Sequence, residues 1–397
     1  MKALVISPQP FFSPRGTPLS IYYRTLVMGE LGVKIDLLTY GEGEDVEIPG
    51  VRIIRIPRFA FLGNVKTGPS FLKLFLDIFI FLKTICLLLV NRYQFVHAHE
   101  EAAFMAYFLK PIFGFKLVYD MHSSLPQQLM NFQFSHSKLL IKIFETLENA
   151  ALGAADVVIT ICEDLYHLVN KKNSNIRNHI LIENSIFDPI LVSAEYPNGH
   201  HQHGVSSNDG SISKLPKNKK IVLYAGTLEP YQGIEVVLRG FKEAIDKNAD
   251  IFLVVVGGRE KQVREYTALA ERLGIAQDCL FTGPVSKGLA AKYLDAADVL
   301  LSPRIAGTNT PLKIYEQLAS GKPIVATNIR SHTQVLIEEV AFLAEPDPPG
   351  LAKGIIDVLT STDKAAQKAK NAKTLYRERY SRQVYQNKIQ QVLEWLK

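Results

Sequence analysis

Short apolar runs alternate with longer segments of helical periodicity through both halves of the 397-residue chain. The run 251–256 is apolar at every position, as expected of a parallel strand buried on both faces. Strands alternating with helices predict α/β domains with parallel sheets. The predicted strands are 2–7, 34–39, 51–56, 94–98, 116–119, 156–161 and 179–182 in the first half, and 220–225, 251–256, 279–282, 298–302 and 323–326 in the second.

The length of the chain exceeds that of one ordinary core, so we expect two domains. A stretch rich in Ser, Asn, Gly and His separates the two sets of strands and marks the boundary. The predicted parts are a first domain at 1–190, a linker or mobile loop at 191–219, a second domain at 220–375, and a C-terminal helix at 376–397 that packs back on the first domain.

One predicted helix, residues 70–90, is almost wholly apolar and long enough to span a membrane. It is interrupted by Lys73, Asp77 and Lys83. Four polar residues, Lys73, Asp77, Thr84 and Asn91, are spaced by four, seven and seven, which places them on one narrow stripe. A carboxylate at the centre of a spanning helix is costly. We therefore predict a helix packed on the sheet.

A basic and apolar rim precedes this helix. Such a rim suits peripheral docking on an anionic membrane, which we keep as a hypothesis. Its residues are Arg52, Arg55, Arg58, Phe59, Phe61, Leu62 and Lys66.

The net charge of +6 suits anionic partners such as phosphates or a membrane surface. The chain has no dense Lys/Arg stripe interleaved with aromatic residues, which disfavours nucleic acid. Cys86, Cys162 and Cys279 are far apart and favour a reducing compartment. Met1 leads directly into an apolar run without a signal peptide, so we expect a cytoplasmic protein, with peripheral contact at the inner face of the membrane as a hypothesis.

The segment 302–326 combines several features of an anion site. A strand leads into a loop and then into a helix that we expect to start near Pro311, with Thr310 as its N-cap. The free N–H groups at a helix start bind anions, and Arg304 and Lys313 add positive charge beside them. Glu316 lies about one turn further on, where it can accept hydrogen bonds from the hydroxyls of a sugar.

This segment resembles the nucleotide-binding signature of glycosyltransferase family four, also called group one. The family has the GT-B architecture, in which two Rossmann-like parallel-sheet α/β domains face each other across a cleft. Glu316 matches the second Glu of the signature, and residues 319–323 match its small residue, Gly and Pro. Further matches are Ser13-Pro-Arg-Gly-Thr-Pro, Val96-His-Ala-His, Ala155-Asp-Val-Val-Ile-Thr and Glu183-Asn-Ser-Ile.

The resemblance implies a retaining glycosyltransferase that takes its sugar from a nucleoside diphosphate and needs no metal or other cofactor. By the same resemblance, 220–375 is the nucleotide-sugar-binding domain and 1–190 is the acceptor-side domain, but the acceptor itself stays open. The basic and apolar rim favours a glycan or a lipid-linked glycan at the membrane surface. His122 follows a predicted strand at the edge where α/β sheets bind ligands, and the family places an active-site histidine there. The predicted catalytic residues are His122, Arg304 and Lys313. The predicted donor-binding residues are Gly16, Thr17, Gly226, Thr227, Gln232, Val285, Thr308, Asn309, Thr310, Pro311, Leu312 and Glu316.

Histidine pairs elsewhere permit metal ligation by their spacing. His97 and His99 are two residues apart at another strand end, and His200, His201 and His203 lie in the predicted linker. We predict that neither group holds a metal.

The chain departs from the family pattern at three places. Thr308 replaces the first Glu of the signature, Thr227 replaces an Arg and Gln232 replaces a Lys, and the two missing cations normally grip the diphosphate. We hypothesise that Arg304 and Lys313 supply this charge instead.

Two rival interpretations remain. The first is a non-catalytic homologue that acts as a partner or regulatory subunit. The second is another enzyme of the same architecture, such as an epimerase or a phosphorylase. A dehydrogenase is disfavoured because no Gly-x-Gly-x-x-Gly follows the first strand.

Overall fold

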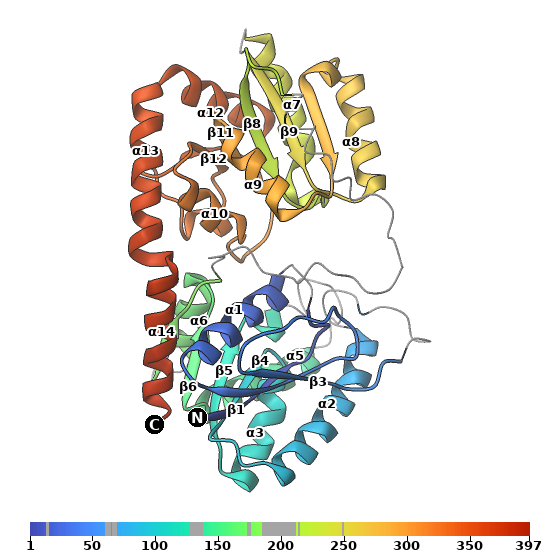
Figure 1. Ribbon diagram of the computed structural model, residues 1–397, viewed down its shortest axis with the longest axis vertical. Helices are drawn as coiled ribbons and strands as arrows, with labels where there is room; N and C mark the ends of the chain where they lie inside the picture. Colours follow the sequence, from blue (N-terminus) through green and yellow to red (C-terminus); the bar gives the residue numbers. More distant parts are fainter. Residues whose placement is uncertain are drawn as a thin grey trace. The chain divides into compact units, whose positions relative to one another are not determined.

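The computed structural model describes residues 1–12, 16–59, 65, 70–127, 138–172, 176–184, 212, 215–247 and 250–397. These residues form two compact units, each with its own sheet (Figure 1). The first unit contains residues up to Asn184 together with Arg382–Lys397, and the second contains the described residues from 212 to Ser381. Most of the predicted linker, including its three histidines, lies outside the described residues, as do Phe61, Leu62 and Lys66.

The sheet of the first unit has the strand order β3-β2-β1-β4-β5-β6-β7, and every neighbouring pair is parallel. Each strand lies within two residues of its prediction. The order reverses direction at β1, which is the position where open α/β sheets bind ligands. The strands are β1 (Lys2–Ser7), β2 (Lys34–Thr39), β3 (Val51–Arg55), β4 (Phe95–His99), β5 (Lys116–Met121), β6 (Val157–Thr160) and β7 (His179–Leu181).

Helices cover this sheet, and three of them form a continuous layer in which α3 packs against both α2 and α5 (Figure 1). The inner side of this layer shares one hydrophobic core with a face of the sheet. The last helix of the chain, α14, packs against α1 within the same unit. The helices are α1 (Gly16–Glu30), α2 (Phe71–Val90), α3 (Ala102–Phe113), α5 (Lys138–Ala154), α6 (Glu163–Lys172) and α14 (Arg382–Trp395).

The sheet of the second unit has the order β10-β9-β8-β11-β12-β13 and is also parallel throughout. The two parallel-sheet α/β units confirm the predicted fold class. The strands are β8 (Lys220–Ala225), β9 (Ile251–Val256), β10 (Cys279–Gly283), β11 (Val299–Ser302), β12 (Ile324–Thr327) and β13 (Phe342–Ala344). The last strand was not predicted, because three residues give no readable alternation.

The helices of the second unit alternate with its strands. They are α7 (Ile234–Asp246), α8 (Glu260–Arg272), α9 (Lys287–Ala296), α10 (Lys313–Ser320), α11 (Arg330–Thr333), α12 (Pro348–Thr360) and α13 (Thr362–Leu375), with short helical turns η3 (Pro230–Gln232), η4 (Ala276–Asp278) and η5 (Tyr376–Tyr380). Glycine is required where η3 meets α7. Gly233 has a positive φ of 75°, and a Cβ built on it would lie 2.1 Å from the carbonyl oxygen of Pro303. The loop after β8 and the loop after β11 therefore meet at this glycine.

Replacing Gly233 with Ala should destabilise the second unit strongly, because it combines a left-handed backbone with a clash against Pro303. Gly274 is a matched control, with a φ of 71° and nothing within 4 Å of its Cβ position. We expect Gly274→Ala to cost about 1 kcal/mol and Gly233→Ala roughly 3 kcal/mol or more in urea unfolding. Equal losses in the two variants would contradict the close approach of the two loops.

Candidate active site

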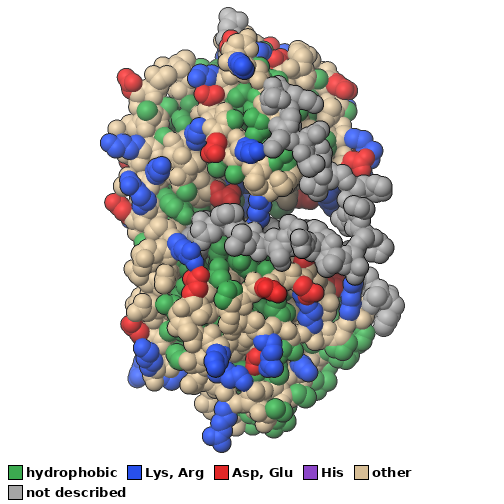
Figure 2. All heavy atoms as spheres, in the orientation of Figure 1, with side chains coloured by type: hydrophobic (Ala, Val, Ile, Leu, Met, Phe, Trp, Pro, Cys, Tyr) green, Lys and Arg blue, Asp and Glu red, His purple; other side chains and the backbone are tan. Residues whose placement is uncertain are grey.

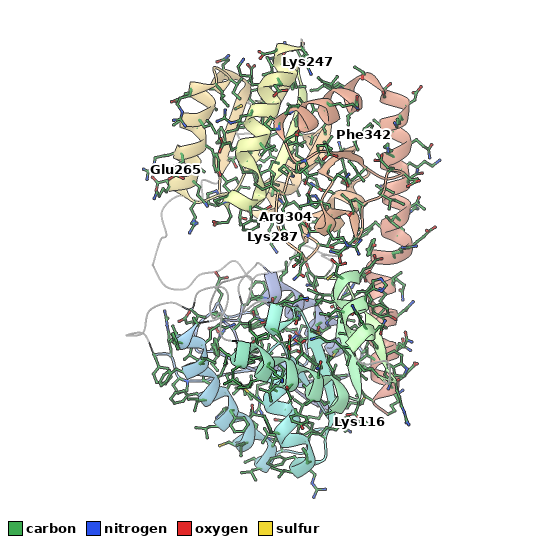
Figure 3. All side chains as sticks on the ribbon, turned by 180° about the vertical axis from the view of Figure 1, so that it is seen from behind. Lys116, Lys247, Glu265, Lys287, Arg304 and Phe342 are labelled. Carbon is green, nitrogen blue, oxygen red and sulfur yellow. The ribbon has the colours of Figure 1, made fainter. Side chains whose placement is uncertain are left out.

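The loops at the carboxyl ends of β8, β10 and β11 carry most of the residues predicted from the second half of the chain. Gly226 and Thr227 follow β8 directly, Gln232 ends η3, and Arg304 lies two residues beyond β11. The carboxyl ends of parallel strands share one edge of a sheet, which is the edge where such sheets bind ligands. Figure 3 shows Arg304 and Lys287 at this end of the second unit.

Lys313, the first residue of α10, connects these loops. Its Nζ lies 4.0 Å from the centre of the Tyr224 ring and 3.4 Å from Oε1 of Gln232. A Cβ on Gly226 would lie 2.8 Å from the same Nζ, so the ammonium needs the space that this glycine leaves. Burial, reinforced by repulsion from Arg304, lowers the pKa of Lys313 to about 7. Its charge is therefore easily gained or lost near neutral pH.

Arg304 is the second cation of this edge. Its Nη1 donates a hydrogen bond of 2.9 Å to the backbone oxygen of Asn309, and its guanidinium lies 5.4 Å from the centre of the Tyr231 ring. Its Nε is buried and has no hydrogen-bond partner among the described residues. Burial lowers the pKa of Arg304, but an arginine remains charged at any ordinary pH. A buried donor without a partner is costly, so an incoming anion would gain by accepting from it.

The start of α10 differs from the prediction. The helix begins at Lys313 and its N-cap is Leu312, without a side-chain cap. Thr310 is therefore not the N-cap, and its Oγ1 is buried without a hydrogen-bond partner in the described part of the chain. Pro311 instead opens a tight turn, since its oxygen accepts from the backbone N–H of Ile314 at 3.0 Å. The prediction failed because Thr before Pro matches the usual helix start, whereas this loop stays irregular for two more residues.

Glu316 lies one turn into α10 and remains exposed. Neighbouring protein atoms partly desolvate its carboxylate and thereby raise its pKa. The nearby cations Lys287 and Lys313 oppose that rise. Lys287, at the start of α9, was not predicted from sequence, because no motif marks it. Val285 lies partly buried two residues earlier, and Thr308 is exposed, with its backbone oxygen accepting from Nε2 of Gln334 at 2.7 Å.

His332 was also missed, because only the fold brings it to this edge. Its Nδ1 lies 2.9 Å from the backbone oxygen of Thr327, so this nitrogen carries the proton. Burial lowers the pKa of His332 to about 4. The neutral ring then offers Nε2 as an acceptor to the hydroxyl of Ser302 at 3.4 Å. The Thr327 hydroxyl in turn donates to the backbone oxygen of Arg304. This chain of contacts joins the ends of β11 and β12 and fixes the loop that holds Arg304.

The first unit contains a separate cluster of buried ionisable side chains at the carboxyl ends of β4 and β5. Asp120 lies at its centre, with the Nε of Arg24 and the Nε2 of His97 each 2.9 Å from its Oδ2. The Nδ1 of His99 lies 3.0 Å from the Nε2 of His122. All five side chains are at most 2% exposed. The sequence indicated the three histidines separately, but not Arg24 or Asp120, which only the fold brings to them.

Electrostatics fixes the protonation of this cluster. Burial opposes the charge of Asp120, yet Arg24 and the neighbouring histidines hold the pKa of its carboxyl well below the usual range. Burial lowers the pKa of His122 to about 4 and that of His99 well below its usual value, so both rings are neutral near pH 7. His97, His99 and Asp120 are close enough to share a metal ion. However, Arg24 already neutralises Asp120 and would repel a cation there, so this donor set does not fit a metal.

The remaining predicted residues of the first unit lie at the start of α1. Gly16 is its first residue, with a positive φ of 56°, and Thr17 is half-buried. Residues 13–15 of the same motif lie outside the described part of the chain. A cavity of about 340 Å³, lined by Lys116, Asp156, Arg177 and Trp395 among others, lies at the opposite, amino-terminal edge of this sheet. Lys116 is labelled in Figure 3. This cavity does not include any predicted site residue.

Two family models match the chain. Residues 25–183 match a glycosyl transferase 4-like domain, and residues 207–375 match the glycosyl transferases group 1. The phosphatidyl-myo-inositol mannosyltransferase of Mycobacterium tuberculosis is 31% identical over 175 residues, which are 42% of this chain and 45% of the relative. The chain thus spans less than half the length of this relative. An uncharacterized glycosyltransferase of Methanocaldococcus jannaschii is 24% identical over 381 residues, or 91% of this chain and 90% of that one.

Solved structures show the same fold. Sucrose-phosphate synthase from Thermosynechococcus elongatus superposes with a TM-score of 0.73 at 20% identity, covering 100% of this chain and 98% of that one. HepE of Anabaena in complex with UDP gives a TM-score of 0.73 at 18% identity, covering 99% of this chain and 100% of that one.

The substitution Asp120→Asn should destabilise the first unit, because it leaves the buried charge of Arg24 uncompensated. We expect a loss of about 3–5 kcal/mol in urea unfolding, part of which the added substitution Arg24→Met should restore. Asp45→Asn is the control, since Asp45 also pairs with an arginine but its side chain is 99% exposed. That variant should unfold like the parent. If Asp120→Asn and Asp45→Asn behave alike, the ion pair does not stabilise the fold.

Proposed function

The chain belongs to the group 1 glycosyltransferases, and from this premise we propose that it is a retaining enzyme that transfers a sugar from a nucleoside diphosphate. The observation that carries the proposal is the pair of cations, Arg304 and Lys313, at the carboxyl edge of the second sheet. The proposed acceptor is a glycan or a lipid-linked glycan. The name of the matched mannosyltransferase, which refers to a phosphatidyl-myo-inositol, motivates the lipid-linked choice.

The geometry supports the hypothesis that these two cations replace the missing Arg and Lys of the family pattern. The Nζ of Lys313 lies 3.4 Å from Gln232 and occupies the space beside Gly226. These are the segments where the family pattern has its cations. Lys313 thus brings a positive charge from α10 to the place where the β8 loop has lost one. Arg304 adds a fixed charge, and its buried Nε finds no hydrogen-bond partner among the residues that the structure describes.

In the proposed reaction, the acceptor hydroxyl attacks the anomeric carbon from the side of the leaving diphosphate, whose oxygen takes the hydroxyl proton. The bond from the anomeric carbon to the phosphate oxygen breaks as the new glycosidic bond forms. Negative charge grows on the diphosphate, so preorganised cations lower the barrier directly. Arg304 and Lys313 supply this charge, and Glu316 binds the ribose hydroxyls.

The other assignments rest on the family pattern and stay predictions. Gly226, Thr227, Gln232 and Thr308 to Leu312 would line the donor site, and the backbone at Val285 would contact the base. Gly16 and Thr17 would bind the phosphates, and His122 would contact the sugar. Because His122 is neutral near pH 7, it would act there as a hydrogen-bonding group rather than as a charge.

Removing the charge of Arg304 should abolish efficient turnover without unfolding the chain. We expect Arg304→Ala to lower kcat/KM at least about a hundredfold in an assay of nucleotide-sugar turnover, because a charge that stabilises the transition state is lost. Arg259→Ala is the control, since Arg259 lies in the same unit, 74% exposed, in a surface ion pair. Wild-type turnover by Arg304→Ala would exclude Arg304 from the mechanism.

Diphosphate binding should be coupled to proton uptake by Lys313. The pKa of Lys313 is about 7 in the free protein, and a neighbouring diphosphate favours the charged form and raises it. Affinity for UDP or GDP should therefore fall as the pH rises above 7. The groups that face this ammonium are Arg304, Glu316, Gln232 and Tyr224.

The measurement is calorimetric titration at pH 8 in two buffers of different ionisation enthalpy. We expect net uptake approaching one proton for the parent chain and none for Lys313→Met. Lys353→Met, at an exposed lysine of the same unit, should keep the parent value. Unchanged uptake in Lys313→Met would assign the proton to another group.

A non-catalytic homologue is the second candidate, favoured by the substitutions Thr227, Gln232 and Thr308. It predicts nucleotide binding with the same dependence on Lys313 but no transfer or hydrolysis of any sugar nucleotide. Turnover by the purified chain across a panel of sugar nucleotides separates the two candidates.

A further inference from the structure

The outer side of α2 is apolar, in contrast to an ordinary surface helix. Seven of its large side chains are 41–83% exposed: Phe71, Leu74, Phe75, Ile78, Leu82, Leu89 and Val90. They recur every three or four residues along most of the helix and therefore form one stripe. Figure 2 shows hydrophobic side chains gathered over α2 at the lower right of the view.

Four polar residues of α2 and its end, Lys73, Asp77, Thr84 and Asn91, lie on the inner side and hold the helix in this orientation, whereas Lys83 is exposed. The hydroxyl of Tyr40 donates a 2.6 Å hydrogen bond to Asp77, and Lys73 pairs with Glu101 at 3.2 Å. Thr84 is buried, and Asn91, just after the helix, accepts from the Nζ of Lys2 at 2.8 Å. Rolling the helix to bury its apolar stripe would break these contacts, so the stripe is fixed outward.

Two neighbouring helices extend this surface. Phe108 and Ile112 of α3 are 55% and 73% exposed, and Leu139 and Ile143 of α5 are 71% and 47% exposed. Because α3 packs against both α2 and α5, these side chains belong to one layer. We call the exposed apolar residues of α2, α3 and α5 the apolar face. Among the described residues, it holds eleven of the fourteen large hydrophobic side chains that are exposed.

Most of the exposed charges on these helices and next to them are positive, although Glu42 lies beside Arg58. Lys83 and Arg92 are exposed on α2 and just after it, Arg58 is exposed before it, and Lys142 is exposed on α5. In the described parts of these helices, only Glu145 places an exposed carboxylate among them. An apolar surface edged with cations is complementary to an anionic bilayer, where lipid tails receive the side chains and headgroups pair with the charges.

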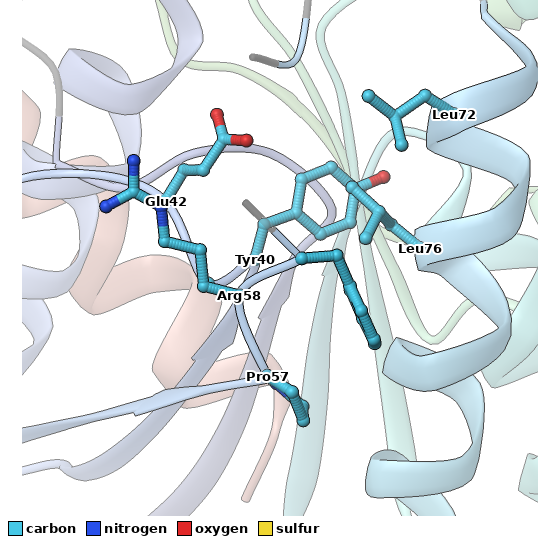
Figure 4. A pocket seen from close by; sticks show the side chains of 8 residues that line it. Tyr40, Glu42, Pro57, Arg58, Leu72 and Leu76 are labelled. Carbon is cyan, nitrogen blue, oxygen red and sulfur yellow. The ribbon is translucent and has the colours of Figure 1, made fainter. Parts of the chain in front are cut away.

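A second copy of the chain fits this surface less well. A two-fold interface sets the same patch against itself, so the cations of one copy would meet those of the other with few carboxylates to pair with them. A small ligand is excluded at the inner side of α2, where the cavity beside Tyr40, Leu72 and Leu76 (Figure 4) holds only about 10 Å³. No helix among the described residues is long and apolar enough to cross a membrane.

We propose that the apolar face of α2, α3 and α5 docks the first unit on the surface of an anionic lipid bilayer, without spanning it. The apolar face adjoins the rim expected from the sequence but consists of other residues. Arg52 pairs with Asp36 and Arg55 binds backbone oxygens and Asp45, while Phe59 packs against Phe75 and Phe79. Of the described rim residues, Arg58 remains as part of the cationic edge.

Cys86 provides a test in the unmodified chain. It is exposed on α2, four residues after Leu82 and therefore on the same stripe, whereas Cys162 is buried and Cys279 is partly buried in the second unit. Vesicles with about one-third phosphatidylglycerol should slow maleimide labelling of Cys86 at least about tenfold and leave Cys279 unchanged, because lipid covers only the apolar face. Vesicles of phosphatidylcholine alone should protect Cys86 much less.

Flotation with the same vesicles tests the residues of the face in the full-length chain. The double variant Ile78→Gln with Leu82→Gln should bind these vesicles at least about tenfold more weakly than the parent. The double variant Lys83→Glu with Arg92→Glu should also bind more weakly, by about fivefold or more for each cation that is replaced. The matched controls are Ile337→Gln, whose side chain is 50% exposed in the second unit, and Lys370→Glu, also exposed there. Both should bind like the parent.

Either of two results would overturn the proposal. The first is equal vesicle binding by parent and face variants, together with unprotected Cys86. The second is a dimer in sedimentation that dissociates in Ile78→Gln with Leu82→Gln while no vesicle is bound, which would assign the face to a second copy. Neither measurement uses a sugar nucleotide, so its outcome is independent of the proposed reaction.

Discussion

Parallel strands buried on both faces confine the chemistry of each unit to the ends of its strands. A strand such as β9 offers no polar side chain along its length, so polar side chains gather mainly toward the ends of the strands and in the loops that follow. Asp120 with its histidines occupies this edge in the first unit, and Arg304 with Lys313 occupies it in the second. The arrangement of both clusters depends on this one constraint.

Burial at that edge forces each charge to find a partner or to change its protonation. Asp120 keeps its charge because Arg24 lies 2.9 Å away. Burial lowers the pKa of His99 and of His122, so both rings are neutral near pH 7. In the second unit the two cations have no carboxylate of comparable proximity among the described residues. The Nζ of Lys313 instead lies over the ring of Tyr224, and its lowered pKa of about 7 means that it loses its proton readily. A cluster of cations in that condition is suited to receive an anion, whereas the Asp120 cluster is already neutralised.

The sequence predicted the strands and the order of the elements well, because buried parallel strands appear as continuous apolar runs. It missed β13, which is too short to show a pattern, and it placed the start of α10 too early. It indicated Arg304, Lys313 and Glu316 as candidates through one contiguous motif, and their roles stay predictions. Arg24, Lys287 and His332 escaped because their proximity to the candidate residues comes only from tertiary packing, which no local spacing encodes.

The helix α2 shows that the periodicity of polar and apolar residues does not by itself predict which face of a helix is buried. The spacing of Lys73, Asp77, Thr84 and Asn91 defines a polar stripe, and the usual rule would turn that stripe to solvent. The structure turns it inward because Tyr40, Glu101 and Lys2 provide partners from three other parts of the chain. A pattern of polar and apolar positions therefore identifies the two faces of a helix, but the partners decide which face is buried. An inward-facing polar stripe would benefit an enzyme that modifies an acceptor held in a bilayer. The polar contacts keep the helix packed on its domain while its apolar side stays exposed.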